Sequence, residues 1–215
     1  MNKKMGMRIG ESVFCIIYLL FDLIAGIIFF QHSSSFLFLL YGIMTLLLGL
    51  GDSFHLIPRV IRNIKVNSKK IEWWMSFGLI ITSITMSLYY LFLYYVWKLL
   101  YNGVALSLIP ILLWSFCFLR IFICLWPQNK WFSGGNIRMA FYRNIIFLFM
   151  GILEVVLFFM LGGGYGIGMG ICILLSFLFY MPVALYGKIN PKLGMLMMPK
   201  TIMYIIMICL GLSLL

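Results

Sequence analysis

The residues best suited to chemistry lie in the segment GDSFHLIPR, residues 51–59. Asp52, His55 and Arg59 are spaced at i, i+3 and i+7, so in a helix they share one face. They would place an acid, a titratable imidazole and a cation on one wall of a pocket, with Asp52 and His55 as catalytic acid/base groups. Alternatively, Asp52 pairs with Arg59 or with a neighbouring helix, and Arg59 is only interfacial. Pro58 is expected to end or kink this helix.

Further cations and amides occur at a similar depth in other apolar segments. As ligand-binding candidates they are Arg120, Arg143, Asn144 and Lys200, in addition to Arg59. An excess of Arg, Lys and amides over acids suits an anion such as a phosphate or carboxylate head group. Because isolated charges inside a membrane are costly, we expect Asp52, His55, Arg120 and Lys200 to converge on one cavity between the second, fourth and seventh apolar segments. The alternative is that the cations reach separately to anionic lipid head groups.

Two acids lie deeper in their apolar segments, Asp22 in the first and Glu154 in the fifth. Either could carry a proton or a coupling ion, and either could equally be protonated and hydrogen-bonded within the protein. Tyr18, one turn before Asp22, is the expected neighbour of Asp22 on the same helix.

No metal site and no cofactor are expected. The chain has two histidines, and His32 falls in a loop between apolar segments. The five cysteines all lie within apolar runs without a CxxC pair, so neither a closed zinc site nor a disulfide framework is predicted. The stretch GGGYGIGMG, residues 162–170, lacks the GK[ST] ending of a phosphate loop. It predicts a tight hairpin in which Gly166 and Gly170 let two helices approach closely.

The elements that must position these residues follow from composition. Hydrophobic residues make up 64% of the 215 residues and charged residues only 10%, whereas soluble domains carry roughly 25% charged residues. A membrane-spanning helix needs about 20 mostly apolar residues. The sequence therefore predicts an all-α integral membrane protein, a seven-helix bundle in one transmembrane domain. The predicted spans are about 13–30, 35–57, 73–97, 104–126, 140–161, 166–187 and 195–215.

The placement of charge predicts the orientation of the bundle. The net charge is +11, and all of the 16 Lys and Arg except Lys98 lie at or near the same ends of the predicted spans. By the positive-inside rule, the N-terminus is cytoplasmic and the C-terminus lies outside. This asymmetry accounts for the charge without nucleic acid, so membrane lipids are the expected partners.

Two family resemblances add expectations. LGLGDSFHLIP, residues 48–58, resembles the LLGD…LLP stretch of lysoplasmalogenase-type membrane proteins, and residues 204–212 are loosely similar to their last helix. This covers about a tenth of the chain; the family usually has eight spans, and its later aspartate motif has no counterpart in LSFLFYMP here. The resemblance implies that Asp52 acts on a lysophospholipid. GDSFHLIPR, PQNKW, YRN and NPKLGMLMMPKT together resemble a bacterial seven-helix membrane protein family, which implies no activity.

The predicted function is that of a multi-pass protein of the bacterial inner membrane. Its polar cavity lies near the cytoplasmic side and binds an anionic or amphipathic, lipid-like small molecule. If the protein is an enzyme, it hydrolyses this molecule. The alternative is a proton- or ion-coupled transporter, or a receptor-like protein, with Asp22 and Glu154 as coupling residues. A cavity open to the inner leaflet favours the enzyme, and a path from outside to Glu154 favours transport.

Overall fold

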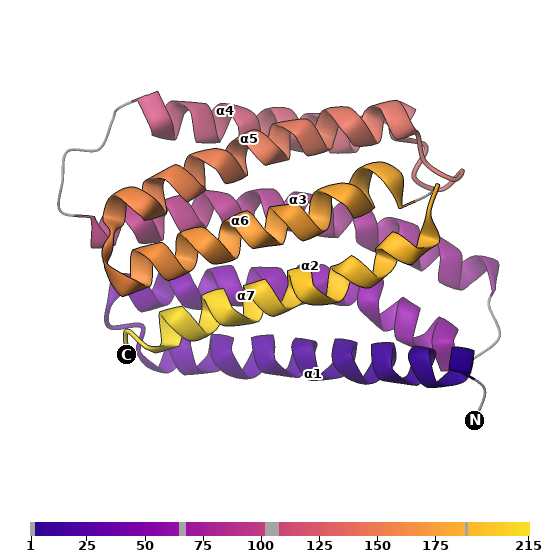
Figure 1. Ribbon diagram of the computed structural model, residues 1–215, viewed down its shortest axis with the longest axis horizontal. Helices are drawn as coiled ribbons and strands as arrows, with labels where there is room; N and C mark the ends of the chain where they lie inside the picture. The colour runs from indigo at the N-terminus through magenta and orange to yellow at the C-terminus, as the bar shows by residue number, and fades with distance from the viewer. Residues whose placement is uncertain (1–2, 65–67, 102–107, 188) are drawn as a thin grey trace.

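Seven long helices run back and forth through a computed structural model of the chain (Figure 1), which describes residues 3–64, 68–101, 108–187 and 189–215. They are α1 (Lys3–Gln31), α2 (Phe36–Ile64), α3 (Lys69–Leu100), α4 (Leu108–Leu125), α5 (Ile137–Leu161), α6 (Gly163–Tyr186) and α7 (Met197–Leu212). Two short 3-10 helices, η1 (Pro127–Asn129) and η2 (Pro191–Leu196), precede α5 and α7. Within these described ranges, seven helices are long and apolar enough to cross a membrane. The predicted all-α, seven-helix membrane fold is confirmed.

Helices α1, α2, α3 and α5 extend beyond the apolar segments that predicted them. Pro58 lies inside α2, which continues to Ile64, so it does not end this helix. The predicted fourth span begins at residue 104, outside the described residues, and α4 is described from Leu108. The predicted hairpin after α5 is confirmed: Gly162 and Gly163 both adopt positive φ angles, of 68° and 62°, which glycine alone adopts at little cost.

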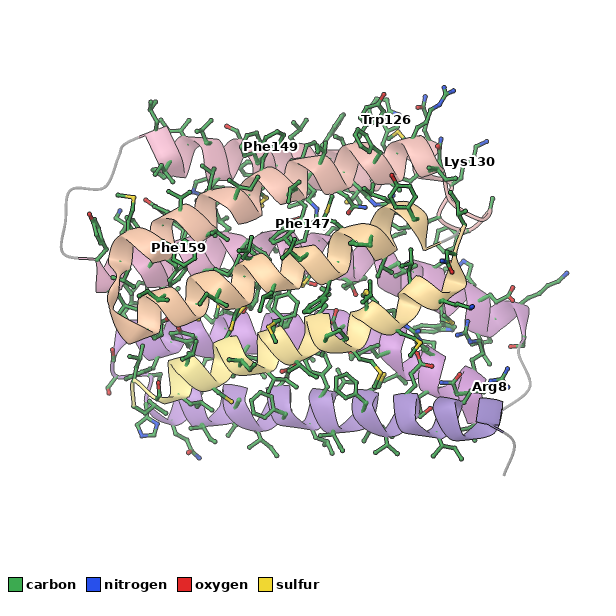
Figure 2. The ribbon with its side chains drawn as sticks, viewed as in Figure 1. Arg8, Trp126, Lys130, Phe147, Phe149 and Phe159 are labelled. Atoms are coloured by element: carbon green, nitrogen blue, oxygen red, sulfur yellow. The ribbon has the colours of Figure 1, made fainter. Side chains whose placement is uncertain are left out.

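Consecutive helices pack against each other, and α7 returns to pack against α1 and α2. α3 lies inside this ring, because it contacts α5 directly as well as α2 and α4. The two termini lie at opposite ends of the bundle (Figure 1). We call the end where α1 begins the basic end, since Arg8 and Lys130 both lie there (Figure 2), and the other end the C-terminal end.

The flanks of the bundle are apolar. Large hydrophobic side chains stay exposed along the middle of the outer helices, for example Ile17 (59% exposed) on α1 and Phe118 (61%) on α4. A continuous apolar surface of this kind is unfavourable in water and suits lipid. The protein is therefore a multi-pass membrane protein.

The core near the C-terminal end is aromatic. Trp97 of α3 is 1% exposed, and its indole nitrogen donates to the carbonyl of Leu157 in α5 at 2.6 Å. The hydroxyls of Tyr41 and Tyr165 hydrogen-bond each other between α2 and α6. Nearby, Gly166 allows α6 to approach α5, because a Cβ there would lie 2.7 Å from the carbonyl oxygen of Phe158. This half of the bundle is closely packed.

Candidate functional site

A cavity of about 120 Å³ lies within the half of the bundle nearer the basic end. All seven helices contribute to its lining, rather than only the three that the sequence predicted. We call it the polar cavity, after the polar side chains around it: Glu11, Tyr18, Asp52, His55, Arg59, Thr82, Ser83, Arg120, Tyr180, Lys200 and Thr201.

Five of the predicted site residues meet here. Asp52, His55 and Arg59 form one wall from α2, as their spacing predicted, while Arg120 comes from α4 and Lys200 from the first turn of α7. The structure therefore brings these side chains together around one space. Their roles in binding or catalysis stay predictions.

Asp52 and Arg59 of α2 form their polar contacts with residues of α1, not with each other. Tyr18 donates its hydroxyl to Oδ2 of Asp52 at 2.9 Å. Arg59 forms an ion pair with Glu11 at 2.5 Å, and both side chains are 28% exposed. Of the two alternatives for Asp52, pairing with Arg59 is thus wrong and pairing with a neighbouring helix is confirmed. Tyr18 also lies beside Asp22, as its spacing predicted. The polar face of α1 is turned toward α2.

His55 is held by a two-step hydrogen-bond chain. Its Nδ1 lies 2.9 Å from the hydroxyl oxygen of Thr82, and this hydroxyl donates to the carbonyl of Gly51 at 2.9 Å. Because the Thr82 hydroxyl has one proton and uses it on Gly51, His55 must donate from Nδ1. Nε2 then keeps its lone pair, so a neutral His55 can accept a proton there.

Arg120 is deeply buried, at 1% exposure. Its Nη1 donates to Oγ of Ser87 at 2.8 Å, and its guanidinium carbon lies 3.6 Å from the ring centroid of Phe147. Nε has no acceptor among the described residues. An arginine fork with a free donor, stacked on an aromatic ring, is suited to bind an anion.

Lys200 is the second buried cation, at 6% exposure. Its ammonium nitrogen lies 4.9 Å from the ring centroid of Tyr180 and 5.1 Å from that of Tyr204, distances typical of cation–π contacts. The Tyr180 hydroxyl donates to Oδ1 of Asn144 at 2.8 Å. Asn144 therefore orients a wall residue and does not itself line the polar cavity.

Arg143 lies outside the polar cavity, and whether it binds a ligand stays a prediction. It donates to Oδ1 of Asn129 at 2.8 Å and lies over the ring of Trp131 at 4.2 Å. The amide of Asn129 in turn donates to the carbonyls of Cys124 and Trp126. Arg143 thus fixes the connection between α4 and α5, because the η1 turn brings this loop back over the start of α5.

The two deep acids do not line the polar cavity either. Asp22 and Glu154 are both 0% exposed, and no described residue hydrogen-bonds to either carboxyl group. Glu154 lies toward Tyr90 and Tyr94 of α3. Whether either acid is a coupling residue stays a prediction.

Sequence reasoning missed several residues of the site, chiefly Glu11, Thr82 and Ser87. One signal for Glu11 was available: Glu11, Cys15, Tyr18 and Asp22 are spaced by four, three and four residues. That is the spacing of one helix face, and it marks the side of α1 that faces the bundle. Thr82 and Ser87 carry no such signal, because single hydroxyls are common in membrane helices.

The described residues contain no group of three or more His, Cys, Asp or Glu side chains that could hold a metal ion. The expectation of no metal and no cofactor stays a prediction. Comparison with protein-family models, curated proteins and solved structures found no match to the chain.

Proposed function

We propose that the polar cavity binds the anionic head group of a lipid-like amphiphile. The observation that carries the proposal is the pair of buried cations, Arg120 and Lys200, on one cavity. Neither forms an ion pair with a carboxylate within the described part of the chain. A buried charge without a counter-charge is unfavourable, so an anion supplied from outside would stabilise both side chains.

The other charges at the polar cavity do not remove this excess. Arg59 and Glu11 neutralise each other, and His55 carries no negative charge in either of its protonation states. Asp52, which already accepts a hydrogen bond from the Tyr18 hydroxyl, then supplies one negative charge against the two positive charges of Arg120 and Lys200. A single anionic group is the complement of this arrangement.

The size of the polar cavity supports a head group rather than a whole lipid. Its volume of about 120 Å³ is well below the roughly 300–1,000 Å³ of pockets that enclose an entire small molecule. Apolar side chains complete the lining, among them Phe14 of α1 and Met197 and Met198 of α7. α1 and α7 diverge toward the basic end (Figure 1). An acyl chain leaving the polar cavity between these two helices would stay in lipid.

The proposal includes the orientation and location inferred from charge: the basic end is cytoplasmic, and the membrane is a bacterial inner membrane. The head group then comes from the inner leaflet. A phosphatase reporter, active only outside the cytoplasm, should be active when fused after Leu215 and silent when fused after Lys65. The reverse pattern would place the polar cavity on the outer side and refute this part.

Hydrolysis of the bound amphiphile is a second candidate function, favoured by the tautomer of His55. Nε2 of His55 is available as a base for water, and Asp52 lies one turn away on the same cavity wall. The lysoplasmalogenase resemblance points to the same chemistry. Mass spectrometry of a lysophospholipid incubated with purified protein should then detect a product that a His55→Gln variant does not form.

Native mass spectrometry with two matched lipids tests the binding proposal. Wild-type protein should retain lysophosphatidylglycerol, which is anionic, in preference to zwitterionic lysophosphatidylcholine. Arg120→Met and Lys200→Met should each lower the affinity for the anionic lipid about tenfold or more, since a hydrogen bond to a charged group contributes roughly 1.5–3 kcal/mol. Arg143→Met is the control, because this cation lies outside the polar cavity.

Three results would refute the proposal. Equal retention of the two lipids would mean that charge is not recognised. Unchanged binding in both cavity variants would mean that the lipid binds elsewhere. An equal loss in Arg143→Met would mean that the anionic lipid binds nonspecifically around the basic end.

A further inference from the structure

A second group of buried polar side chains, from α1, α2 and α3, lies deeper in the bundle than the polar cavity. Its centre is Asp22, whose two carboxyl oxygens have no hydrogen-bond partner among the described residues. The hydroxyls of Thr45 on α2 and Tyr89 on α3 are also fully buried and lack a partner there. Tyr89 lies within electrostatic range of Asp22. Polar groups buried in this way are uncommon and call for a physical explanation.

Gly49 makes room for Asp22 at the contact between α1 and α2. A Cβ at position 49 would lie 2.7 Å from the Cβ of Asp22 and 3.2 Å from its Oδ2. The carboxyl group therefore packs directly on the backbone of α2. Thr45 is one turn before Gly49 on the same helix, so its hydroxyl belongs to the same face.

Tyr18 connects this deep group to the polar cavity. It is one turn before Asp22 on α1, and it lies within interaction range of the Asp22 carboxyl group. Its hydroxyl donates to Oδ2 of Asp52, which lines the polar cavity. Asp22, Tyr18 and Asp52 thus form a row from the core of the bundle to the cavity, with the hydroxyl between the two carboxyl groups.

An ionised Asp22 would be costly at this position. Transfer of an isolated carboxylate into a dry interior costs up to tens of kcal/mol, and protonation removes that cost. No described cation forms an ion pair with Asp22. The group facing it across Tyr18 is another acid, Asp52, so the surroundings favour a neutral Asp22.

We propose that Asp22 holds a proton and exchanges it with the polar cavity through Tyr18 and Asp52. The forward step requires the Asp22 carboxyl group to move into hydrogen-bonding contact with the Tyr18 hydroxyl. The Asp22 proton then moves to the Tyr18 oxygen while the Tyr18 proton moves to Oδ2 of Asp52. Two O–H bonds break and two form, the tyrosine is unchanged, and the negative charge passes from Asp52 to Asp22. His55 and Lys200 lie nearest to the Asp52 end of the row.

Infrared spectroscopy of the full chain in lipid nanodiscs tests whether Asp22 is protonated. At neutral pH, wild-type protein should show carboxylic acid C=O absorption, and Asp22→Asn should remove one component of it. Glu154→Gln, which changes the other fully buried acid, should leave that component in place. Asp22→Glu keeps a carboxyl group at position 22 and should shift this absorption component. It replaces Asp22→Asn in the test if Asp22→Asn fails to fold.

Exchange from H₂O into D₂O tests the route. Tyr18→Phe should keep the Asp22 component but slow its exchange by about 100-fold, the lower end of what a positioned proton-transfer group contributes. Tyr204→Phe, a buried tyrosine outside the row, should exchange at the wild-type rate.

The proposal fails if Asp22→Asn removes no carboxylic acid absorption, because Asp22 would then be ionised. It also fails if Tyr18→Phe exchanges as fast as wild type. Neither measurement uses a ligand, so the result is independent of lipid binding.

Discussion

Near the C-terminal end, α3 and α5 are joined by the buried indole of Trp97, which donates to a backbone carbonyl. Near the basic end, the same two helices flank Arg120, whose Nε lacks an acceptor in the described chain. Between the same two helices, one end thus buries an indole whose donor has an acceptor, and the other buries a guanidinium group with an unused donor. Buried polar atoms left without partners cost stability and are retained mainly where they serve a function. We therefore expect the C-terminal half to carry the stability and the basic half to carry the activity.

The largest effect should come from the aromatic half. Trp97→Ala removes a large, fully buried side chain and its hydrogen bond to Leu157, so the free energy of unfolding should fall by about 3–5 kcal/mol. Unfolding in mixed micelles with increasing SDS, followed by circular dichroism, measures it. A loss below about 1 kcal/mol, as expected of a surface position, would contradict the assignment of stability to this half.

A smaller loss should follow from closing the space between α2 and α3. A Cβ on Gly78 would collide with the backbone of Phe54 and His55. Gly78→Ala should therefore separate the two helices and lower the free energy of unfolding by about 1–3 kcal/mol, as overpacking does. It should also weaken the hydrogen bond between His55 and Thr82, which nitrogen NMR of the imidazole would detect.

The control for this substitution is Gly10→Ala. A Cβ at Gly10 would meet no atom within 4 Å, and alanine is the better helix former. The control should unfold at the same SDS fraction as wild type or a higher one. If both variants lose stability equally, the close approach of α2 and α3 is not the cause.

Hydropathy and length were sufficient to predict seven helices, because each apolar run in lipid must satisfy its own backbone hydrogen bonds. The periodicity of Asp52, His55 and Arg59 likewise predicted one wall of the polar cavity, since all three lie on one helix. Such features depend on a single helix and its solvent.

Features that depend on two helices were not predictable in the same way. The Tyr18–Asp52 and Glu11–Arg59 contacts require the rotation of α1 about its own axis. The contact between Arg143 and Asn129 depends on η1, which turns the chain between α4 and α5. Local spacing marks the face of α1 that turns inward, but not the residues of α2 that it meets, and it does not encode the η1 turn. Both follow from packing across the bundle.

In the basic half, removal of a cation should have the opposite effect to the loss of Trp97. Lys200→Met replaces a buried ammonium group with an apolar side chain of similar length, between the rings of Tyr180 and Tyr204. The free energy of unfolding should rise by about 1 kcal/mol, as happens when buried charges are replaced by apolar groups. The same SDS titration measures it, while lysophosphatidylglycerol binding should fall. A variant that loses both stability and binding would show that Lys200 is structural.

The smallest effect should belong to the ion pair at the edge of the polar cavity. Glu11 and Arg59 are each 28% exposed, and exposed pairs typically contribute only about 0.2–1 kcal/mol. A double-mutant cycle of Glu11→Gln and Arg59→Met, measured by SDS unfolding, should therefore give a coupling free energy in this range.

Breaking the same ion pair also tests whether the excess positive charge at the polar cavity attracts the anion, because Glu11 neutralises Arg59. Glu11→Gln frees Arg59 beside the polar cavity and should strengthen binding of lysophosphatidylglycerol, whereas Arg59→Met should leave it nearly unchanged. If Arg59→Met instead weakens binding as much as Arg120→Met does, then Arg59 contacts the head group directly and the anion site extends from the core to the basic end.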